Sequence, residues 1–595
     1  MFLKKLRRRK NGKDHMYWAV VESYRTARGS RHRVVAYLGE LKDRERSGWA
    51  KLVRDLARRP SPLVQRGLFE EESEAVPEEV TVNVRGVRVE ETKDFGDVWL
   101  GLMLWRGLGL DDLFEKRLPK GRERVRWDLL ATILTIGRFC EPSSERQIEE
   151  TWYPRTCLPD LLGVRAREVY VQRLYRALDV LYPQKAAVER HLKDRLGTLF
   201  KIEYDLLLYD VTSTYFEGEA AKNRQAQRGY SRDHRADCKQ VCIGLVVTPE
   251  GLPLGYEVFD GNRHDATTLE EIVGCMEAKY GRAKRIWVLD RGMVDEGNLR
   301  FLRERGGHYV VGTPRAWLRK YETELTESGW GSVYEDVEVK LCPSSDGDET
   351  FVLCRSRQRM EKEKGIHERF SRRIEEGLEK LAARLRRAKK CPSRSRVERQ
   401  IGRLLQRNSR AAKKYQISVL DDPEREGHLR LEWTCRSEWI EWAEISEGAY
   451  LLRTNVKGRN AQELWHTYIQ LTDVESAFRT IKSELEVRPI YHQVRHRVHG
   501  HILVAFLAYA MWKTLQIWME RGGLGRGVRT VIEEFARLKC CEVILPTNTG
   551  REITLSCVTR PDGWQRTLMS RLGIKIPTRL GNPRWRGALE TRSQM

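Results

Sequence analysis

The sequence contains no hydrophobic run long enough to cross a membrane. Its longest apolar run covers residues 502–512, whereas a membrane-spanning helix needs about 20 apolar residues. The basic start, residues 1–13, is not followed by a long apolar segment, so we expect no secretory signal. Both absences argue against membrane proteins and exported proteins.

Paired-cysteine spacing and internal repeats are missing as well. The 12 cysteines are scattered, and most lie in apolar contexts typical of strands or helices, as Cys242 and Cys354 do. This pattern suits reduced thiols in a cytosol better than a disulfide framework. We find no internal repeat of fixed period.

Positive charge is what the sequence has in excess. Its 595 residues include 108 Lys and Arg against 85 Asp and Glu, so the net charge is +23 at pH 7. Residues 355–415 alone carry 22 basic and 7 acidic residues, a net +15. General solubility is the alternative explanation for the total charge. For residues 355–415 the alternative is a solvated helical surface, but such a surface would be expected to carry charges of both signs. The excess therefore predicts a polyanionic partner, most often nucleic acid.

Changes in hydrophobic period divide the chain into six segments. Residues 76–203 are helical and favour DNA binding, although a helix-turn-helix and an ordinary helical bundle explain them equally well. The six predicted segments are a basic arm with a β-hairpin (1–75), the helical segment (76–203), the first part of an α/β core (204–330), a β-rich insertion with a basic helical hairpin (331–450), the second part of the core (451–525) and a C-terminal tail (526–595).

The core segment 204–330 predicts a mixed sheet. Three strand-like runs come first, followed by a helix, a strand, a second helix and a fifth strand. This order indicates an α/β fold with helices packed on the faces of the sheet. In the insertion, apolar residues at helical spacing on either side of Cys391-Pro392 predict a helical hairpin.

Three acidic residues are candidates for a metal site. Asp210 ends the first strand of the core and Asp290 ends the fourth, and in a sheet of this order these two strands can be neighbours. Two close carboxylates repel each other unless a cation neutralises them, and Mg²⁺ is commonly bound by one or two carboxylates plus waters and phosphate. Glu475 is the candidate third ligand, because Tyr468, Glu475 and Lys482 recur every seven residues and so share one helical face. Each acid taken alone has an ordinary structural explanation, but together they favour a metal.

Four strings in this order resemble the DDE transposases of bacterial insertion sequences, in the subgroup with a β-rich insertion between the second Asp and the Glu. They are YDVTSTYFEG (209–218), residues 228–269, VLDRGM (288–293) and YIQLTDVESAFRTIKS (468–483). The subgroup has a Tyr-x2-Arg-x3-Glu-x6-Lys signature, which Tyr468, Glu475 and Lys482 match. Leu471 stands at the signature Arg position, and Arg479 is the residue that could replace that Arg.

The resemblance implies a ribonuclease-H-like catalytic domain with Asp210, Asp290 and Glu475 as catalytic residues and metal ligands. It implies two Mg²⁺ ions, with Mn²⁺ as a substitute, and metal-dependent phosphoryl transfer that cleaves the element's ends and joins a 3′-hydroxyl to target DNA. Double-stranded DNA is the implied partner of a homodimer in the prokaryotic cytoplasm, at the nucleoid. The implied DNA-binding residues are Tyr468, Arg479, Lys482 and Arg291.

Some related enzymes form a DNA hairpin and stack a flipped base on an aromatic side chain. Candidates for that role here are Trp317, Trp330, Trp439 and Trp442, although core packing is the commoner role of any one of them. Asp265 is expected to cap the helix that follows it. Two other functions stay open: a catalytically inactive DNA-binding protein on the same scaffold and, with less support, an RNA-cleaving nuclease of the same fold.

Overall fold

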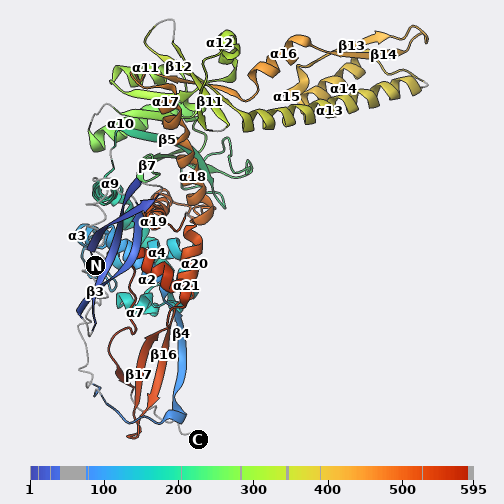
Figure 1. Cartoon of the computed structure of the whole chain (residues 1–595). Helices are drawn as coiled ribbons and strands as arrows, with labels where there is room; N and C mark the ends of the chain where they lie inside the picture. The colour runs from blue at the N-terminus through green and yellow to red at the C-terminus, as the bar shows by residue number, and fades with distance from the viewer. Residues whose placement is uncertain are drawn as a thin grey trace. The chain divides into compact units, whose positions relative to one another are not determined.

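The computed structural model describes residues 2–10, 13–26, 29–39, 76–77, 79–202, 204–281, 285–334, 336–343, 347–388, 390–525 and 527–586 (Figure 1). The chain forms two compact units. The first unit comprises Met1–Ala283 together with Thr472–Met595, and the second unit comprises Lys284–Leu471. In sequence, the second unit therefore interrupts the first.

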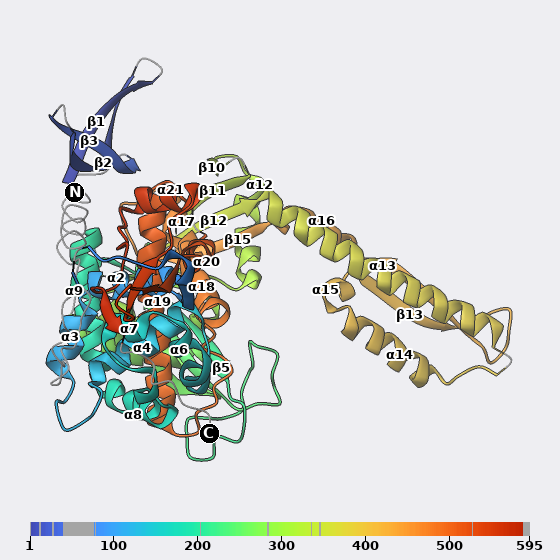
Figure 2. The ribbon, with the colours of Figure 1, turned by 90° about the horizontal axis from the view of Figure 1, so that it is seen from below.

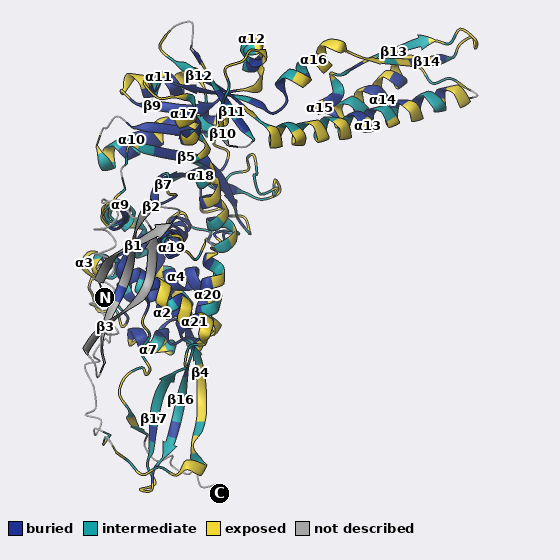
Figure 3. Cartoon of the chain, viewed as in Figure 1, coloured by how far each residue is buried: buried dark blue, intermediate teal, exposed yellow. Residues whose placement is uncertain are grey.

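The long helix α19 (Arg495–Arg521) lies at the centre of the first unit. It is the one helix in the described ranges that is long and apolar enough to cross a membrane, yet 94% of its apolar 18-residue window is buried inside the protein (Figure 3). It packs against α2 (Gly96–Gly107), α4 (Trp127–Cys140), α8 (Val171–Leu181) and α20 (Val528–Ala536). A helix that is apolar all round is expected in such a core.

Most side chains of α2 and α4 are buried, so neither helix has a free face that could enter a DNA groove. For these two helices the structure favours the bundle over the helix-turn-helix. The other helices in the described part of the first unit are α3 (Leu110–Arg117), α5 (Glu145–Gln147), α6 (Tyr153–Arg155), α7 (Leu158–Leu162), α9 (Lys185–Phe200), α10 (Leu269–Tyr280), α18 (Leu471–Arg479) and α21 (Gly563–Leu572), with short 3₁₀ or π turns at Val84–Gly86, Ile148–Trp152, Ala166–Glu168, Tyr182–Gln184, Asp265–Thr268 and η8 (Thr480–Glu484).

The described strands of the first unit form three groups. β5, β6 and β7 pair antiparallel in chain order, and β4 joins the C-terminal strands in the order β18-β17-β16-β4. The N-terminal strands form a three-stranded antiparallel sheet in which the basic start of the chain is itself strand β1, paired with β2. The strands are β1 (Phe2–Lys10), β2 (Lys13–Thr26), β3 (Gly29–Gly39), β4 (Arg88–Asp94), β5 (Leu206–Tyr215), β6 (Gln240–Val247), β7 (Pro253–Asp260), β16 (Lys539–Pro546), β17 (Glu552–Val558) and β18 (Arg584–Arg586).

The second unit is built on a mixed sheet with the strand order β10-β11-β12-β15-β9-β8. β8 and β9 are parallel, and the other pairs are antiparallel. Its strands are β8 (Ile286–Leu289), β9 (His308–Gly312), β10 (Gly331–Tyr334), β11 (Val337–Pro343), β12 (Thr350–Ser356) and β15 (Ala449–Thr454). Helices α11 (Glu296–Glu304), α12 (Glu322–Thr326), α16 (Ser437–Ser446) and α17 (Ala461–Ile469) and the 3₁₀ turns η6 (Arg291–Met293) and η7 (Arg315–Tyr321) complete it.

A second core in this unit holds together residues 357–435, here called the arm (Figure 2). The apolar faces of α13 (Arg357–Arg387) and α14 (Arg394–Arg407) share one buried cluster with the hairpin β13 (Tyr415–Asp421) and β14 (Leu429–Cys435), and α15 (Ser409–Ala412) joins them. The helices break around Cys391-Pro392, where the sequence predicted it. The arm thus has a small core of its own, in which the two helices pack on a β-hairpin, and is more than a helical hairpin.

The order of elements through the core, β5-β6-β7-α10-β8-α11-β9, is the order predicted from the sequence. The protein has a mixed α/β fold containing a large mixed sheet, which confirms the predicted class at this level. The six predicted segments remain predictions, because the two compact units do not test their boundaries.

Candidate active site

Asp210 lies in β5, in the first unit, with its side chain half-buried. Its Oδ1 accepts a hydrogen bond of 2.7 Å from the backbone N–H of Val211. Side chains alternate along a strand, so Asp210, Thr212 and Thr214 share one face of the sheet. Asp210 pairs with Leu245 on β6 across the ladder.

Glu475 lies on α18, also in the first unit, and its side chain is exposed to solvent. A small cavity of about 20 Å³ lies between this helix and the sheet. Thr212, Thr214 and Leu245 line it from the sheet, and Phe478 from the helix. Because Phe478 lies about one turn after Glu475, the structure packs the helix that carries Glu475 on the face of β5 that carries Asp210.

Asp290 lies in the second unit, directly after the buried strand β8. It is exposed, and its backbone carbonyl accepts a 3.0 Å hydrogen bond from Met293 N–H in the turn that follows. The structure thus assigns Asp210 and Glu475 to one unit and Asp290 to the other. The meeting of all three carboxylates stays a prediction.

Arg232 is a cation near Asp210 that the sequence did not reveal. Burial lowers the pKa of Arg232, but the ion pair with Asp265 and the charge of Asp210 outweigh burial and raise it overall. Asp265 was expected to cap a helix, and this was wrong: His264 occupies the cap position, and the Asp265 carboxylate binds Arg232 instead.

Lys482 is held in a buried ion pair. Its Nζ donates to Asp233 Oδ1 at 2.8 Å, and Arg488 donates to the same oxygen. Burial lowers the pKa of Lys482 despite the opposing effect of Asp233. The sequence predicted that one helix carries both Glu475 and Lys482. Lys482 instead lies in the π-helical turn η8, and a π turn does not keep the seven-residue spacing on one face.

Replacing Asp233 by Ala should destabilise the first unit by about 3–5 kcal/mol, because two cations would lose their shared buried partner. The side chains of Asp233 and Lys482 are only 3% and 10% exposed. Urea denaturation followed by fluorescence measures the change. The matched control is Asp237→Ala in the same loop, whose exposed pair with Arg235 should contribute at most about 1 kcal/mol. Equal effects of the two substitutions would show that the buried ion pair contributes no more to the free energy of unfolding than the exposed one.

The three other predicted DNA-binding residues lie in different settings. Arg479 is exposed on α18, and Arg291 is exposed directly after Asp290; neither forms an ion pair with any described residue. Tyr468 is half-buried on α17, and its hydroxyl lies 2.6 Å from where a Cβ at Gly312 would stand, so a larger residue at position 312 would displace the tyrosine.

Arg291 and Tyr468 line one cavity of about 320 Å³ in the second unit. Trp465 and Tyr450 belong to the same lining, and Trp465 Nε1 donates to the Tyr450 hydroxyl at 2.6 Å. Its two further cations are Arg315 and Arg359, both paired with Glu363. The cavity combines aromatic rings with guanidinium groups.

The tryptophans proposed as stacking platforms lie elsewhere. Trp317, Trp330 and Trp442 pack against a hydrophobic cluster of the second unit, and Trp439 contacts His367 edge to face. For the first three, core packing accounts for the side chain. Trp465 was not selected from the sequence, because nothing in its local pattern distinguishes it from a core residue.

Comparison with known proteins adds family evidence to this geometry. A family model described as the transposase DDE domain matches residues 201–511, and one described as the IS1634 family transposase N-terminal domain matches residues 3–62. No curated protein matches the chain. A solved piggyBac transposase synaptic complex with hairpin DNA is similar with a TM-score of 0.35 and 9% identity, covering 77% of this chain and 84% of that chain. The first family match spans more than half of the chain and includes Asp210, Asp290 and Glu475.

Proposed function

The chain belongs to the DDE transposases, enzymes that cleave and join DNA, and from this premise we propose that it mobilises its own bacterial insertion sequence. In this proposal it binds the ends of the element, cleaves them, and joins the freed 3′-hydroxyl to target DNA. It acts as a homodimer on DNA in the cytoplasm, at the nucleoid. The observation that carries the proposal is the packing of the Glu475 helix on the face of β5 that carries Asp210.

Asp210, Asp290 and Glu475 are the proposed catalytic residues and metal ligands. Members of this family generally depend on divalent metal ions, and the three side chains offer only carboxylate oxygens, the ligands that Mg²⁺ prefers. We propose two Mg²⁺ ions, which Mn²⁺ can replace; when bound, they activate water or a 3′-hydroxyl and stabilise the leaving oxygen. The exposure of Asp290 and Glu475 leaves both accessible to a DNA phosphate.

Arg479 and Arg291 are the proposed phosphate contacts nearest to these carboxylates in sequence. Both are exposed, and an unpaired guanidinium can bind a phosphate in a bidentate way. Lys482 contributes only if Asp233 releases it. We assign the cavity that contains Tyr468 to an unpaired nucleotide, since its rings can stack on a base while its guanidinium groups face the backbone.

The function is tested with the purified full chain and DNA that carries the imperfect inverted repeats expected on both sides of its reading frame. Cleavage at the element ends should require Mg²⁺ or Mn²⁺ and should disappear when the end sequence is scrambled. Binding to the ends without cleavage in either metal would instead support the inactive DNA-binding protein. Preferential cleavage of RNA would support the nuclease.

The arm offers a row of basic side chains for DNA that has no sequence preference. Arg396, Arg399, Arg403 and Arg407 recur at helical spacing on α14, and all four are exposed. None of the four is ion-paired within the part of the chain that the structure describes. This unpaired, single-sign row is what phosphate binding requires.

Substituting Arg399 and Arg403 by Gln should weaken binding to random DNA and reduce the slope of log K against log salt by about 1.8, or about 0.9 per lost phosphate contact. Fluorescence anisotropy at several salt concentrations measures the slope. The control removes the same charge at two exposed residues of the first unit, Arg537→Gln with Arg566→Gln, and should leave the slope nearly unchanged. An unaltered slope in the arm variant would show that α14 faces solvent or a protein partner.

We assign recognition of the element ends to residues 1–203, because catalytic carboxylates act on any phosphodiester and carry no sequence information. An isolated 1–203 fragment would lack the partners of β4, α4 and α8, which lie in β16 and α19. The test therefore uses the full chain.

Removing residues 1–75 should lower the ratio of affinities for the true end and for scrambled DNA by at least about 100-fold, since specific sites are typically bound 10³–10⁷ times more tightly. Competition binding at physiological salt measures the ratio, and light scattering checks whether the segment serves dimerisation instead. An unchanged ratio would move the specificity to residues 76–203, the insertion or the tail.

A further inference from the structure

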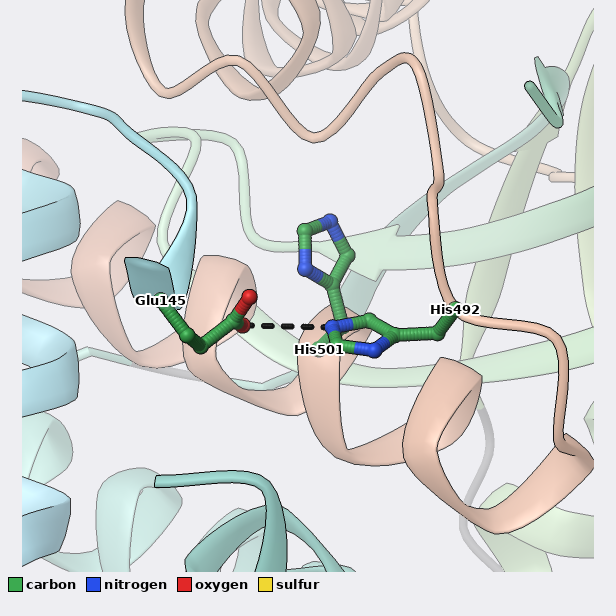
Figure 4. A group of neighbouring side chains, drawn as sticks. All are labelled: Glu145, His492 and His501. Carbon is green, nitrogen blue, oxygen red and sulfur yellow. Dashed lines mark hydrogen bonds and ion pairs between the residues drawn. The ribbon is translucent and has the colours of Figure 1, made fainter. Parts of the chain in front are cut away.

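Glu145, His492 and His501 form a buried cluster in the first unit that includes none of the proposed catalytic residues (Figure 4). Glu145 begins α5, His492 lies between η8 and α19, and His501 lies on α19. The three residues are 6%, 8% and 6% exposed. One ligand atom of each lies within 4.8 Å of the others.

The hydrogen bond made by His501 fixes the position of its proton. Its Nε2 lies 3.1 Å from the carbonyl oxygen of Val487, which can only accept, so Nε2 carries the hydrogen. His501 is only 6% exposed, and a buried imidazole is most stable in its neutral form. The other nitrogen, Nδ1, therefore holds a lone pair, and this atom is buried without a hydrogen-bond partner in the described structure.

That lone pair lies on the side of the ring that faces the Glu145 carboxylate (Figure 4). Glu145 Oε1 lies 3.2 Å from His492 Nε2, and an ionised carboxylate offers only acceptor oxygens. Two acceptors thus face each other in a buried space. Such an arrangement costs free energy unless a cation lies between them.

We propose that Glu145, His492 and His501 bind one divalent first-row transition ion, with Zn²⁺ as the best-fitting ion. Two imidazole nitrogens and one carboxylate oxygen form a known three-ligand zinc set, with water in the fourth position. In the bound state His492 is the neutral tautomer with its hydrogen on Nδ1, so that Nε2 ligates the ion in place of its contact with Glu145, and the Val487 carbonyl orients the His501 ring from behind. Imidazole ligands favour Zn²⁺ over Mg²⁺, so the site is chemically distinct from the three carboxylates.

Arg138 is the charge that opposes a cation here. It is buried, and its guanidinium donates to the carbonyl of Glu486 at 3.1 Å rather than to the cluster. Its repulsion lowers the affinity, so a strong chelator should remove the ion. The ion would link α5 to α19, which belong to the two separate sequence segments of the first unit, and its role is structural.

The test measures zinc in the full chain after dialysis against excess Mg²⁺, in an Asp210→Asn background that weakens metal binding at the catalytic carboxylates. We expect about one Zn²⁺ per chain, an increase in Tm on adding Zn²⁺ to chelated protein, and a tetrahedral Co²⁺ absorption band on replacement. His501→Ala should lose all three signals. His499→Ala should keep them, because His499 is equally buried on the same helix but bonds Gln225 at 2.7 Å, outside the cluster.

Absence of retained zinc in the folded parent chain would overturn the proposal, as would equal retention by His501→Ala and His499→Ala. If His501→Ala does not fold by circular dichroism, Glu145→Gln replaces it, since the amide keeps the shape and removes the charge. If neither variant folds, the Co²⁺ spectrum of the parent chain decides, because it reports imidazole ligation directly. DNA cleavage is not used as a readout, so the result is independent of the proposed transposition.

Discussion

Glu475→Gln should abolish metal-dependent cleavage of the element ends while DNA binding is kept. The amide has the shape of the carboxylate but loses the charge that holds a divalent ion. Metal-ion stabilisation contributes several kcal/mol to such transition states, so we expect a decrease in cleavage rate of at least about 1,000-fold. Because Glu475 is exposed, the substitution should not lower the stability of α18.

The matched control is Glu463→Gln on α17. Glu463 takes part in a capping box with Asn460, which Gln can also complete, so this variant should cleave normally. End-labelled DNA on a denaturing gel measures cleavage, and anisotropy measures binding. Retained nicking by Glu475→Gln in Mg²⁺ would remove Glu475 from the catalytic set, and loss of binding would point to a DNA contact instead.

Deletion of the arm should cause the second large effect, a loss of most sequence-independent DNA binding. The segment 355–415 carries +15 of the chain's +23 net charge, and counterion release makes each phosphate contact contribute strongly at low salt. We expect affinity for random DNA to fall at least about 100-fold at low salt, together with a flatter salt dependence.

The structure determines where the deletion must end. Removing residues 357–413 alone would strip α13 and α14 from β13 and β14 and expose Tyr415, Leu429 and Leu431. Replacing residues 357–435 by a short Gly/Ser linker removes the shared core as a whole. A full-length chain with the Arg399 and Arg403 substitutions controls for charge without deletion. Unchanged binding by the deletion variant would assign the arm to a protein partner.

Local sequence patterns predicted the elements of the core well, because each strand and helix there has its own hydrophobic period. Pairings across long sequence distances were beyond those patterns. β4 pairs with β16, more than 400 residues later in the chain, and neither sequence segment indicates which strand it pairs with. The basic start of the chain was interpreted as a basic extension beside the hairpin, yet its backbone forms β1 and pairs with β2. The sequence did not predict this strand, because alternation is hard to recognise among consecutive cations.

The same limit applies to the candidate site. Asp210, Asp290 and Glu475 were selected from their places at strand ends and on a helical face, and the resemblance then implied their catalytic role. Asp233 and Arg232 were missed because their importance comes from partners on other elements, Lys482 and Asp265. A loop sequence shows that charges are present, but only the fold shows which of them are buried and paired.

The interruption of the first unit has a consequence for synthesis of the protein. Helices α2, α4 and α8 leave the ribosome long before α19, the helix that covers their apolar faces. About 300 residues separate α9 from α19, which corresponds to about 15–60 s of translation at about 5–20 residues per second. During that interval the nascent chain exposes these apolar faces to solvent, so we expect it to need a chaperone that prevents aggregation. The helix that carries Glu475 is made in the same late stretch, so a chain that stops before it would lack one of the proposed catalytic carboxylates.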